Sequence, residues 1–241
     1  MMMKILRVIS LLMDYPTAEL VAAEQELSRA VQQSPLAEEQ QQALLLFIRQ
    51  HCQQDLLSWQ EQYDGLFERG RSLSLLLFEH VHGESRDRGQ AMVDLVNQYK
   101  QAGLGIAVNE LPDFIPLYLD FLSTQGEENG RLGLQEVAHI LALLACRLEQ
   151  READYAVLFH SLIQLSDMAL DLDDLRSQIA AEEPDHTAKA LDKVWEEEMV
   201  NFMDNAESSC GNNNRPSEGQ RRDQHIPLNT ELLNASAVDR A

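Results

Sequence analysis

The sequence predicts an all-α fold: a single compact multi-helix bundle over residues 1–203, followed by a flexible C-terminal tail over residues 204–241. Leu, Ala, Gln and Glu dominate the composition, and these residues lose little side-chain freedom in a helix, whereas the sparser Val, Ile and Thr lose more. Apolar residues recur three and four positions apart through most of the chain. Alternation of apolar and polar residues never runs long enough to predict a strand.

The first helix is predicted over Met1–Met13 and ends before Pro16. This segment is only faintly similar to a signal peptide, because charged and polar residues interrupt its apolar run and no small-residue cleavage site follows. The next helix start is predicted at Ser34, which is placed to cap a helix that has Pro35 at its first position.

Further helices are predicted from four apolar stripes, each of which needs another element to pack against. Their members are Met92, Leu95, Val96 and Tyr99; Val137, Ile140, Leu141, Leu144 and Leu148; Leu158, Leu162, Leu165, Ala169 and Leu172; and Leu191, Val194, Trp195, Met199 and Phe202. A shorter apolar helix is predicted over Leu73–Val81. Asp113 is predicted to cap a helix with Pro116 in its first turn, and Thr187 to cap the last long helix.

The composition changes after Met203, where the apolar periodicity stops and Asn, Ser and Gly gather between residues 205 and 214. Such a segment buries too little apolar surface to offset the entropy lost on ordering it. We therefore expect one helical domain up to residue 203 and a disordered tail after it.

The charge balance of the chain restricts its partners. There are 19 Lys and Arg residues against 40 Asp and Glu residues, which gives a net charge of -21. Nucleic acids and anionic membrane surfaces both attract basic proteins, so neither is an expected partner. A strongly acidic surface favours a partner that carries positive charge.

The three cysteines, Cys52, Cys146 and Cys210, lie far apart and form no C-x-x-C pair. This pattern predicts neither a disulfide framework nor a zinc ribbon, and it fits a reducing compartment. The longest apolar runs, such as Ile140–Cys146, are too short to span a membrane. A cytoplasmic location is therefore expected.

The sequence contains no P-loop, no serine nucleophile elbow and no complete dinucleotide fingerprint, so no catalytic residue and no cofactor is expected. The best metal candidate is His80 with His82, but residues two apart on a helix point to different sides. The pair would share a metal only if the helix ended between them. We expect no metal site and keep a helical metal-dependent enzyme using the His80/His82 region as the alternative. His139, flanked by apolar residues, is expected in the core or half-buried.

Basic residues gather on both sides of the apolar segment Leu73–Val81, in Arg69–Arg71 and in Arg86–Arg88. In the simpler interpretation they pair with surface carboxylates, which contributes about 0–1 kcal/mol per pair. The alternative is a basic rim that orients an acidic patch or a phosphate-bearing cofactor.

Several segments together resemble one known family. They are Tyr63–Arg71, Ser74–Met92, Glu110–Asp113, Pro116–Leu119 and Val194–Glu198. They resemble the NarJ or delta-subunit family, the dedicated chaperones of membrane-bound respiratory nitrate reductase, within the wider group of TorD-like chaperones for molybdenum enzymes. The resemblance runs over roughly residues 5–203 and is densest from 61 to 122.

This resemblance implies an all-helical chaperone without catalytic activity. The implied partner is the catalytic (alpha) subunit of respiratory nitrate reductase, bound while immature and chiefly at its N-terminal tail, so that the molybdenum cofactor is inserted before the enzyme docks at the membrane. Two family motifs supply the implied peptide-binding residues: Tyr63, Leu66 and Phe67, and Glu110, Pro112, Asp113 and Phe114. Phe114 stands where the family pattern has histidine, so no role that needs an imidazole is implied for it.

The first motif also has an interpretation from its spacing. Tyr63, Leu66 and Phe67 share one face of a helix, which is suited to line a groove for an amphipathic peptide helix. Without the family resemblance, such a stripe is more often part of a core than of a groove. Beside a specific chaperone, two alternatives stay open: the metal-dependent enzyme, and a non-specific holdase that binds many unfolded chains.

Overall fold

The computed structural model describes residues 2–81, 86–105, 110–190 and 192, and for residues 86 and 87 it describes the backbone alone. The chain divides into two units, Met1–Leu191 and Asp192–Ala241, and the fold given below is that of the first unit. The predicted boundary after residue 203 and nearly all of the predicted last helix lie outside the described residues.

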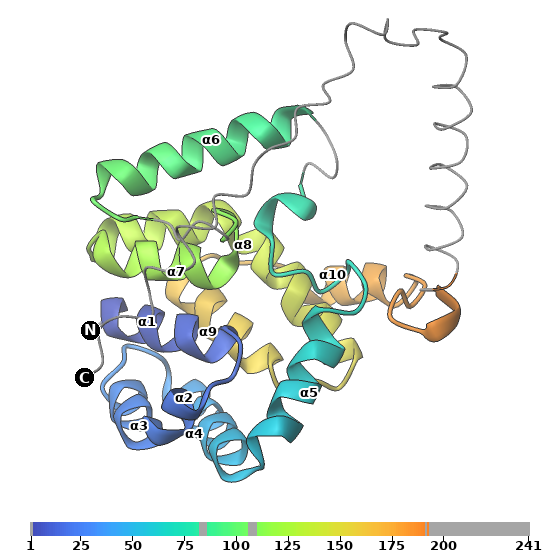
Figure 1. Ribbon diagram of the computed structural model, residues 1–241, viewed down its shortest axis with the longest axis horizontal. Helices are drawn as coiled ribbons and strands as arrows, with labels where there is room; N and C mark the ends of the chain where they lie inside the picture. The colour runs from blue at the N-terminus through green and yellow to red at the C-terminus, as the bar shows by residue number, and fades with distance from the viewer. Residues whose placement is uncertain (1, 82–85, 106–109, 191, 193–241) are drawn as a thin grey trace, which may run out of the picture. The chain divides into compact units, whose positions relative to one another are not determined.

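The described residues form helices and no strand, which confirms the predicted all-α class (Figure 1). In chain order the helices are α1 (Met2–Met13), α2 (Ala18–Ala22), α3 (Glu24–Gln32), α4 (Glu38–Gln53), α5 (Leu56–Phe67), the 3₁₀ helix η1 (Leu77–Glu79), α6 (Arg86–Gln101), α7 (Ile115–Thr124), α8 (Glu127–Gln150), α9 (Ala156–Ser166) and α10 (Leu172–Ile179).

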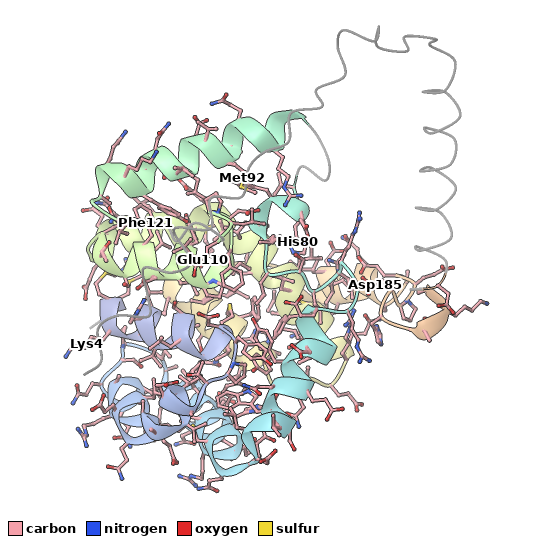
Figure 2. All side chains as sticks on the ribbon, viewed as in Figure 1. Lys4, His80, Met92, Glu110, Phe121 and Asp185 are labelled. Atoms are coloured by element: carbon pink, nitrogen blue, oxygen red, sulfur yellow. The ribbon has the colours of Figure 1, made fainter. Side chains whose placement is uncertain are left out.

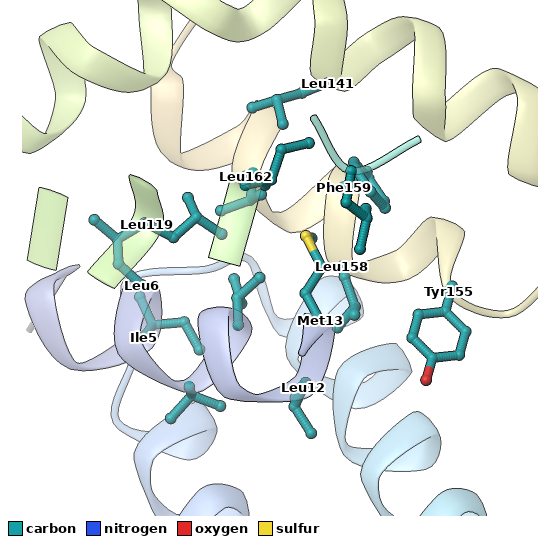
Figure 3. Close-up of a cluster of buried hydrophobic side chains, with 14 of the residues drawn as sticks. Ile5, Leu6, Leu12, Met13, Leu119, Leu141, Tyr155, Leu158, Phe159 and Leu162 are labelled. Atoms are coloured by element: carbon teal, nitrogen blue, oxygen red, sulfur yellow. The ribbon is translucent and has the colours of Figure 1, made fainter. Parts of the chain in front are cut away.

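Helix α1 lies at the centre of the core. It packs against α7 and α9, and α8 packs along α9. The side chains that meet there come from α1, α7, α8 and α9 with its N-cap residue, and Figure 3 labels Ile5, Leu6, Leu12, Met13, Leu119, Leu141, Tyr155, Leu158, Phe159 and Leu162. A helix that is apolar on most of its circumference must be surrounded by other elements. The predicted first helix is thus confirmed, as a core element.

Several predicted helix boundaries are wrong, and the first two errors lie in connecting turns. Helix α4 begins at Glu38 with Ala37 as its N-cap, not at Ser34. Ser34 instead belongs to the turn after α3, where its N–H donates to Val31 O at 3.0 Å and the chain then buries Leu36. A turn that brings an apolar side chain into the core therefore overrides the Ser-Pro start signal.

The second error is the long stripe that starts at Leu158. Helix α9 ends at Ser166 because Asp167 takes a left-handed conformation, with φ of 59°. Ala169, which the periodicity placed on the buried face, is exposed in the connection. A new helix, α10, then starts after Asp171, whose carboxylate accepts from the N–H groups of the first turn.

The segment Leu73–Val81 is not the helix that the sequence predicted. Its first part pairs with the start of α7: Ile115 N–H donates to Leu75 O at 2.8 Å, and Leu76 and Phe114 form an isolated antiparallel bridge. Only the three residues of η1 are helical. Tertiary pairing here satisfies backbone groups that a helix would have satisfied within the segment.

Candidate functional site

Helix α5 directs the first predicted motif toward the core. Tyr63 and Phe67 are only 3% and 6% exposed, and Leu66 is half-buried against the same core. The ring centroids of Tyr63 and Phe67 lie 4.9 Å apart, and that of Phe67 lies 5.1 Å from Tyr155. Such ring pairs contribute more stability to a core than the burial of their apolar area alone provides.

Hydrogen bonds anchor the polar atoms of this aromatic cluster. Trp59 Nε1 donates to the Tyr155 hydroxyl at 2.7 Å, and the Tyr63 hydroxyl donates to Met13 O at 3.2 Å. Burial raises the pKa of Tyr63 and Tyr155, so both hydroxyls keep their protons. Tyr63 and Phe67 thus stabilise the fold in this structure, and direct peptide contact by them stays a prediction.

The second predicted motif joins two parts of the chain. Glu110 is exposed, Pro112 and Asp113 are buried, and Phe114 is half-buried. The Tyr99 hydroxyl of α6 donates to Pro112 O at 2.7 Å. On the other side, the carbonyl of Asp113 accepts from the N–H of Leu77 at 2.9 Å. The motif therefore fixes both α6 and the segment around η1 to the start of α7.

The Asp113 side chain does not cap a helix, contrary to the prediction, because α7 begins at Ile115 with Phe114 as its N-cap. Its Oδ2 instead accepts from the N–H of Phe78 at 3.1 Å, with Arg88 Nη2 at 4.0 Å, while the residue is fully buried. Burial raises the pKa of Asp113, although the Phe78 N–H and the Arg88 charge oppose that rise. This carboxyl group acts as a strut that holds η1 in place.

The segment held by Asp113 forms one wall of a groove of about 340 Å³. Helices α6, α7 and α8 supply the other walls. The lining residues are Leu77, Phe78, Val81, Ala91, Asp94, Leu95, Gln98, Tyr118, Glu136, Val137 and Ile140. Most of them are apolar, so the groove offers surface that is costly to leave in water.

The groove exists because α6 is attached to the bundle along one side only. Helix α6 lies on the outer side of α7 (Figure 1), and in its described part Leu95 and Tyr99 are its buried apolar residues. The Tyr99 ring packs 4.8 Å from the ring of Phe121 on α7. Figure 2 labels Phe121, and also Met92, which is half-buried. The space between α6 and α8 is consequently left open.

The charged residues of the groove are carboxylates. Asp94 of α6 and Glu136 of α8 both line it, and Asp94 Oδ1 accepts from Gln90 at 2.9 Å. Arg88 of α6 does not line the groove, and its Nη2 lies 3.6 Å from Glu79 Oε1. An apolar groove with acidic residues in its walls is suited to an amphipathic segment that carries basic side chains.

Of the two histidines in the alternative metal-site hypothesis, only His80 lies in the described part of the chain. His80 Nε2 bonds to the carbonyl of Ser74 at 2.8 Å, and burial lowers the pKa of His80, which favours a neutral, donating ring. His82 lies outside the described residues. Residues 2–81, 86–105, 110–190 and 192 contain no group of three or more His, Cys, Asp or Glu side chains that could hold a metal ion.

His139 was expected in the core or half-buried, and this expectation is wrong because the residue is exposed. Its neighbour Ala138 and the next-turn Leu141 face the core of α8, which turns His139 outward. The apolar residues beside a histidine in sequence are therefore a poor guide to its burial in a helix.

Sequence reasoning did not find the groove. Phe78, Val81, Val137 and Ile140 come from two distant segments, and only the fold brings them together with α6. The sequence contains one hint, because Val81 is apolar and is followed by a polar stretch. In the structure its side chain is 59% exposed. An isolated exposed valine is common, however, so this signal alone does not identify a groove.

None of the helices formed by the described residues is both long enough and apolar enough to cross a bilayer.

Comparison with known proteins places these features in one family. The family model "Nitrate reductase delta subunit" matches residues 16–161. The chain is 50% identical over 205 residues to NarJ of Escherichia coli K12, a nitrate reductase molybdenum cofactor assembly chaperone, which covers 85% of this chain and 86% of that one. It is 46% identical over 210 residues to NarW of the same organism, covering 86% and 87% of the two chains.

A solved structure extends the comparison to the fold. A chain from Archaeoglobus fulgidus assigned as a redox enzyme maturation protein matches with a TM-score of 0.50 and 20% sequence identity. The match covers 70% of the chain studied and 95% of the other chain. At this level of identity the likeness concerns the helical architecture alone.

Proposed function

We propose, because this chain belongs to the nitrate reductase delta subunit family, that it acts as an assembly chaperone for a nitrate reductase and not as an enzyme. The client is the immature catalytic subunit, held chiefly by its N-terminal tail until the molybdenum cofactor has been inserted. Binding takes place in the cytoplasm, before the client docks at the membrane.

The observation that supports this proposal is the apolar groove between η1, α6, α7 and α8. Its volume of about 340 Å³ accommodates a few side chains, not a whole folded partner. An amphipathic helix that places apolar residues at positions i, i+3 and i+4 fits such a groove. Asp94 and Glu136 then attract the basic residues that flank the apolar face of the tail.

The proposal gives the second family motif a positioning role. Asp113 holds the backbone of Phe78, and Pro112 holds Tyr99 of α6, so the motif fixes two opposite walls of the groove. Binding therefore depends on Asp113 through groove geometry. Tyr63 and Phe67 support the groove through the stability of the core, and their direct contact with the peptide stays a prediction.

The test is calorimetric titration of the full chain with a synthetic peptide of the N-terminal tail of the catalytic subunit. Val81→Ser removes apolar surface from the groove, and we expect it to cost about 1–2 kcal/mol, or roughly five- to thirty-fold in affinity. Val93→Ser is the matched control, because Val93 is 52% exposed on α6 and does not line the groove. Equal affinities of the two variants would move the peptide site elsewhere.

A peptide of the same composition in scrambled order separates the specific chaperone from the non-specific holdase. We expect the scrambled peptide to bind at least roughly tenfold more weakly, because its apolar residues no longer share one helix face. Binding of both peptides with one affinity would favour the holdase.

A further inference from the structure

Outside the groove, the loop that follows α5 holds a carboxylate from the far end of the described chain. Asp185 Oδ2 accepts from the backbone N–H groups of Arg71 at 2.8 Å and of Ser72 at 2.7 Å. Its Oδ1 accepts from the Ser72 hydroxyl and from Arg151 Nη2, each at 2.7 Å. Figure 2 shows Asp185 beside this loop. Four donors from two regions thus converge on one anionic group.

The backbone of this loop is shaped to admit an anion. Gly70 has φ of +85°, and a Cβ at that position would lie 2.6–2.9 Å from the carboxylate atoms of Asp185. Only glycine allows both this conformation and this approach. Two consecutive N–H groups that point to one side form a concave anion site of the kind found in many phosphate-binding loops.

The arginines behind the loop add fixed positive charge in a strongly acidic protein. Arg147 and Arg151 are one helical turn apart at the end of α8. Arg147 forms two bonds with Glu182, at 2.8 and 2.9 Å, and a third with the carbonyl of Ser72 at 2.9 Å. Arg151 Nη1 is buried and has no hydrogen-bond partner among the described residues. The Arg151 guanidinium, whose Nη2 bonds to Asp185, therefore carries a further donor that Asp185 does not use.

The site also has more room than a carboxylate needs. It opens into a hollow of about 330 Å³, and the lining residues are Ser72, Arg147, Gln150, Arg151, Glu182, Glu183, Pro184, Asp185 and His186. Glu182 in this lining is paired with Arg147. Burial by itself would raise the pKa of Asp185, but the hydrogen bonds from Ser72 and Arg71 and the charge of Arg151 outweigh it and lower that pKa. The ionised form of the Asp185 carboxyl group is therefore favoured in this position.

We propose that Gly70–Ser72, Arg147 and Arg151 form a binding site for a phosphate group, and that Asp185 occupies this site in cis when the phosphate is absent. Phosphate has three or more acceptor oxygens, so it uses Arg151 Nη1 as well as the donors that Asp185 uses. The ligand class is a small phosphate-bearing molecule that extends into the hollow. This proposal does not depend on peptide binding at the groove.

The experiment measures binding of inorganic phosphate to the full chain by ³¹P NMR titration. Asp185→Ala removes the internal competitor, and we expect it to bind phosphate roughly tenfold or more tightly than the wild-type chain, on the scale of one charge-assisted contact. Glu39→Ala is the charge-matched control, because Glu39 is exposed in the first turn of α4, and it should bind as the wild type does.

A second substitution locates the site. In the double variant Asp185→Ala, Arg151→Gln, the gained phosphate affinity should be lost, since Arg151 supplies both the shared and the spare donor. Asp185→Asn keeps the side-chain volume and replaces the alanine variant in the test if that variant does not fold. We expect Asp185→Asn also to bind phosphate more tightly than the wild-type chain, by a smaller factor, and to lose this gain when Arg151→Gln is added.

Three outcomes would overturn the proposal. They are a phosphate affinity of Asp185→Ala no higher than that of Glu39→Ala, an affinity that survives loss of Arg151, and acetate binding as tightly as phosphate. The first would make the contact a purely structural clasp, the second would place the anion elsewhere, and the third would make the site one for carboxylates.

Discussion

Helices α5 and α6 both carry an apolar face with aromatic residues, yet they end up in opposite roles. Helix α5 buries three large rings, those of Trp59, Tyr63 and Phe67, and the cluster around Tyr155 fills the space behind it. Helix α6 buries Leu95 and Tyr99, and beside them it leaves a groove. The difference lies in how much side-chain volume each helix brings to its contact, because a packed interior tolerates few voids.

The two family motifs follow the same division. The motif on α5 lies inside the aromatic cluster, where its residues stabilise the bundle. The motif at Glu110–Phe114 lies where α6, η1 and α7 meet, and its hydrogen bonds shape the groove. We therefore expect substitutions in the first motif to act through folding and those in the second to act through the geometry of the binding site.

The largest expected effect tests the core role of α5. Phe67→Ala removes a ring that packs on Tyr63 and Tyr155, and truncation of a buried Phe costs about 3–5 kcal/mol of unfolding free energy. Leu66→Ala on the same helix is the comparison, because Leu66 is half-buried and should cost less than half as much. Urea denaturation measures both. If Phe67→Ala lost little unfolding free energy but much peptide affinity, the motif on α5 would belong to the binding site.

The next effect tests the strut at Asp113. Asp113→Ala removes the acceptor of the partly buried N–H of Phe78, which costs about 1–3 kcal/mol. Asp113→Asn keeps an acceptor oxygen and should retain most of the stability at neutral pH. If the carboxyl group shapes the groove, the alanine variant should also lose peptide affinity. An alanine variant as stable as the asparagine variant would show that the hydrogen bond is dispensable.

The same pair of variants gives a pH dependence with a definite sign. Burial raises the pKa of Asp113 in the folded chain above its unfolded value of about 3.9. The native state therefore takes up the proton first as the pH falls through the folded pKa. The wild type should gain stability relative to Asp113→Asn over that window and stop gaining below the unfolded pKa. Thermal melts of both proteins across the acidic range measure the difference.

The sequence predicted the parts of the fold that depend on local periodicity. The apolar face of α1 and the stripes of α8 and α9 needed no knowledge of their partners, since a helix with such a face must bury it. The predicted helix over Leu73–Val81 was wrong because the backbone of this segment pairs with the start of α7, through the bond from Ile115 N–H to Leu75 O. No local sequence pattern indicates this distant partner. Ser34 failed as a cap because it lies in the turn after α3, four residues before α4 begins. Asp113 failed because its carboxylate accepts from the N–H of Phe78 instead.

The candidate site was less predictable than the fold for the same reason. The family motifs directed attention to Asp113, but its actual bond to Phe78 spans 35 residues. The groove needs four elements, and the contact between Asp185 and the loop at Gly70 spans more than 110 residues. Local spacing carries no information about such distant partners. The basic residues of Arg69–Arg71 indicated that a carboxylate binds nearby, but not that this carboxylate is Asp185.

The smallest expected effect separates charge from apolar burial at the groove of α6. Asp94→Asn and Glu136→Gln each remove one carboxylate from the lining, which should cost about 0.2–1 kcal/mol of peptide affinity. Charges near a binding site act mainly on association, whereas apolar contacts act mainly on dissociation. Stopped-flow kinetics should therefore show slower association for these two variants and faster dissociation for Val81→Ser.

Salt provides the control for this last prediction. With a net charge of -21, the wild-type chain should attract a basic tail over long range, and at about 0.15 M salt the Debye length of about 8 Å confines that attraction to nearby carboxylates. Association should slow as salt rises, and the difference between wild type and Asp94→Asn should shrink. Apolar burial is not weakened by salt, so measurable binding should persist at about 1 M. Complete loss of binding there would mean that charge alone holds the tail, and the acidic helix faces would replace the groove as the site.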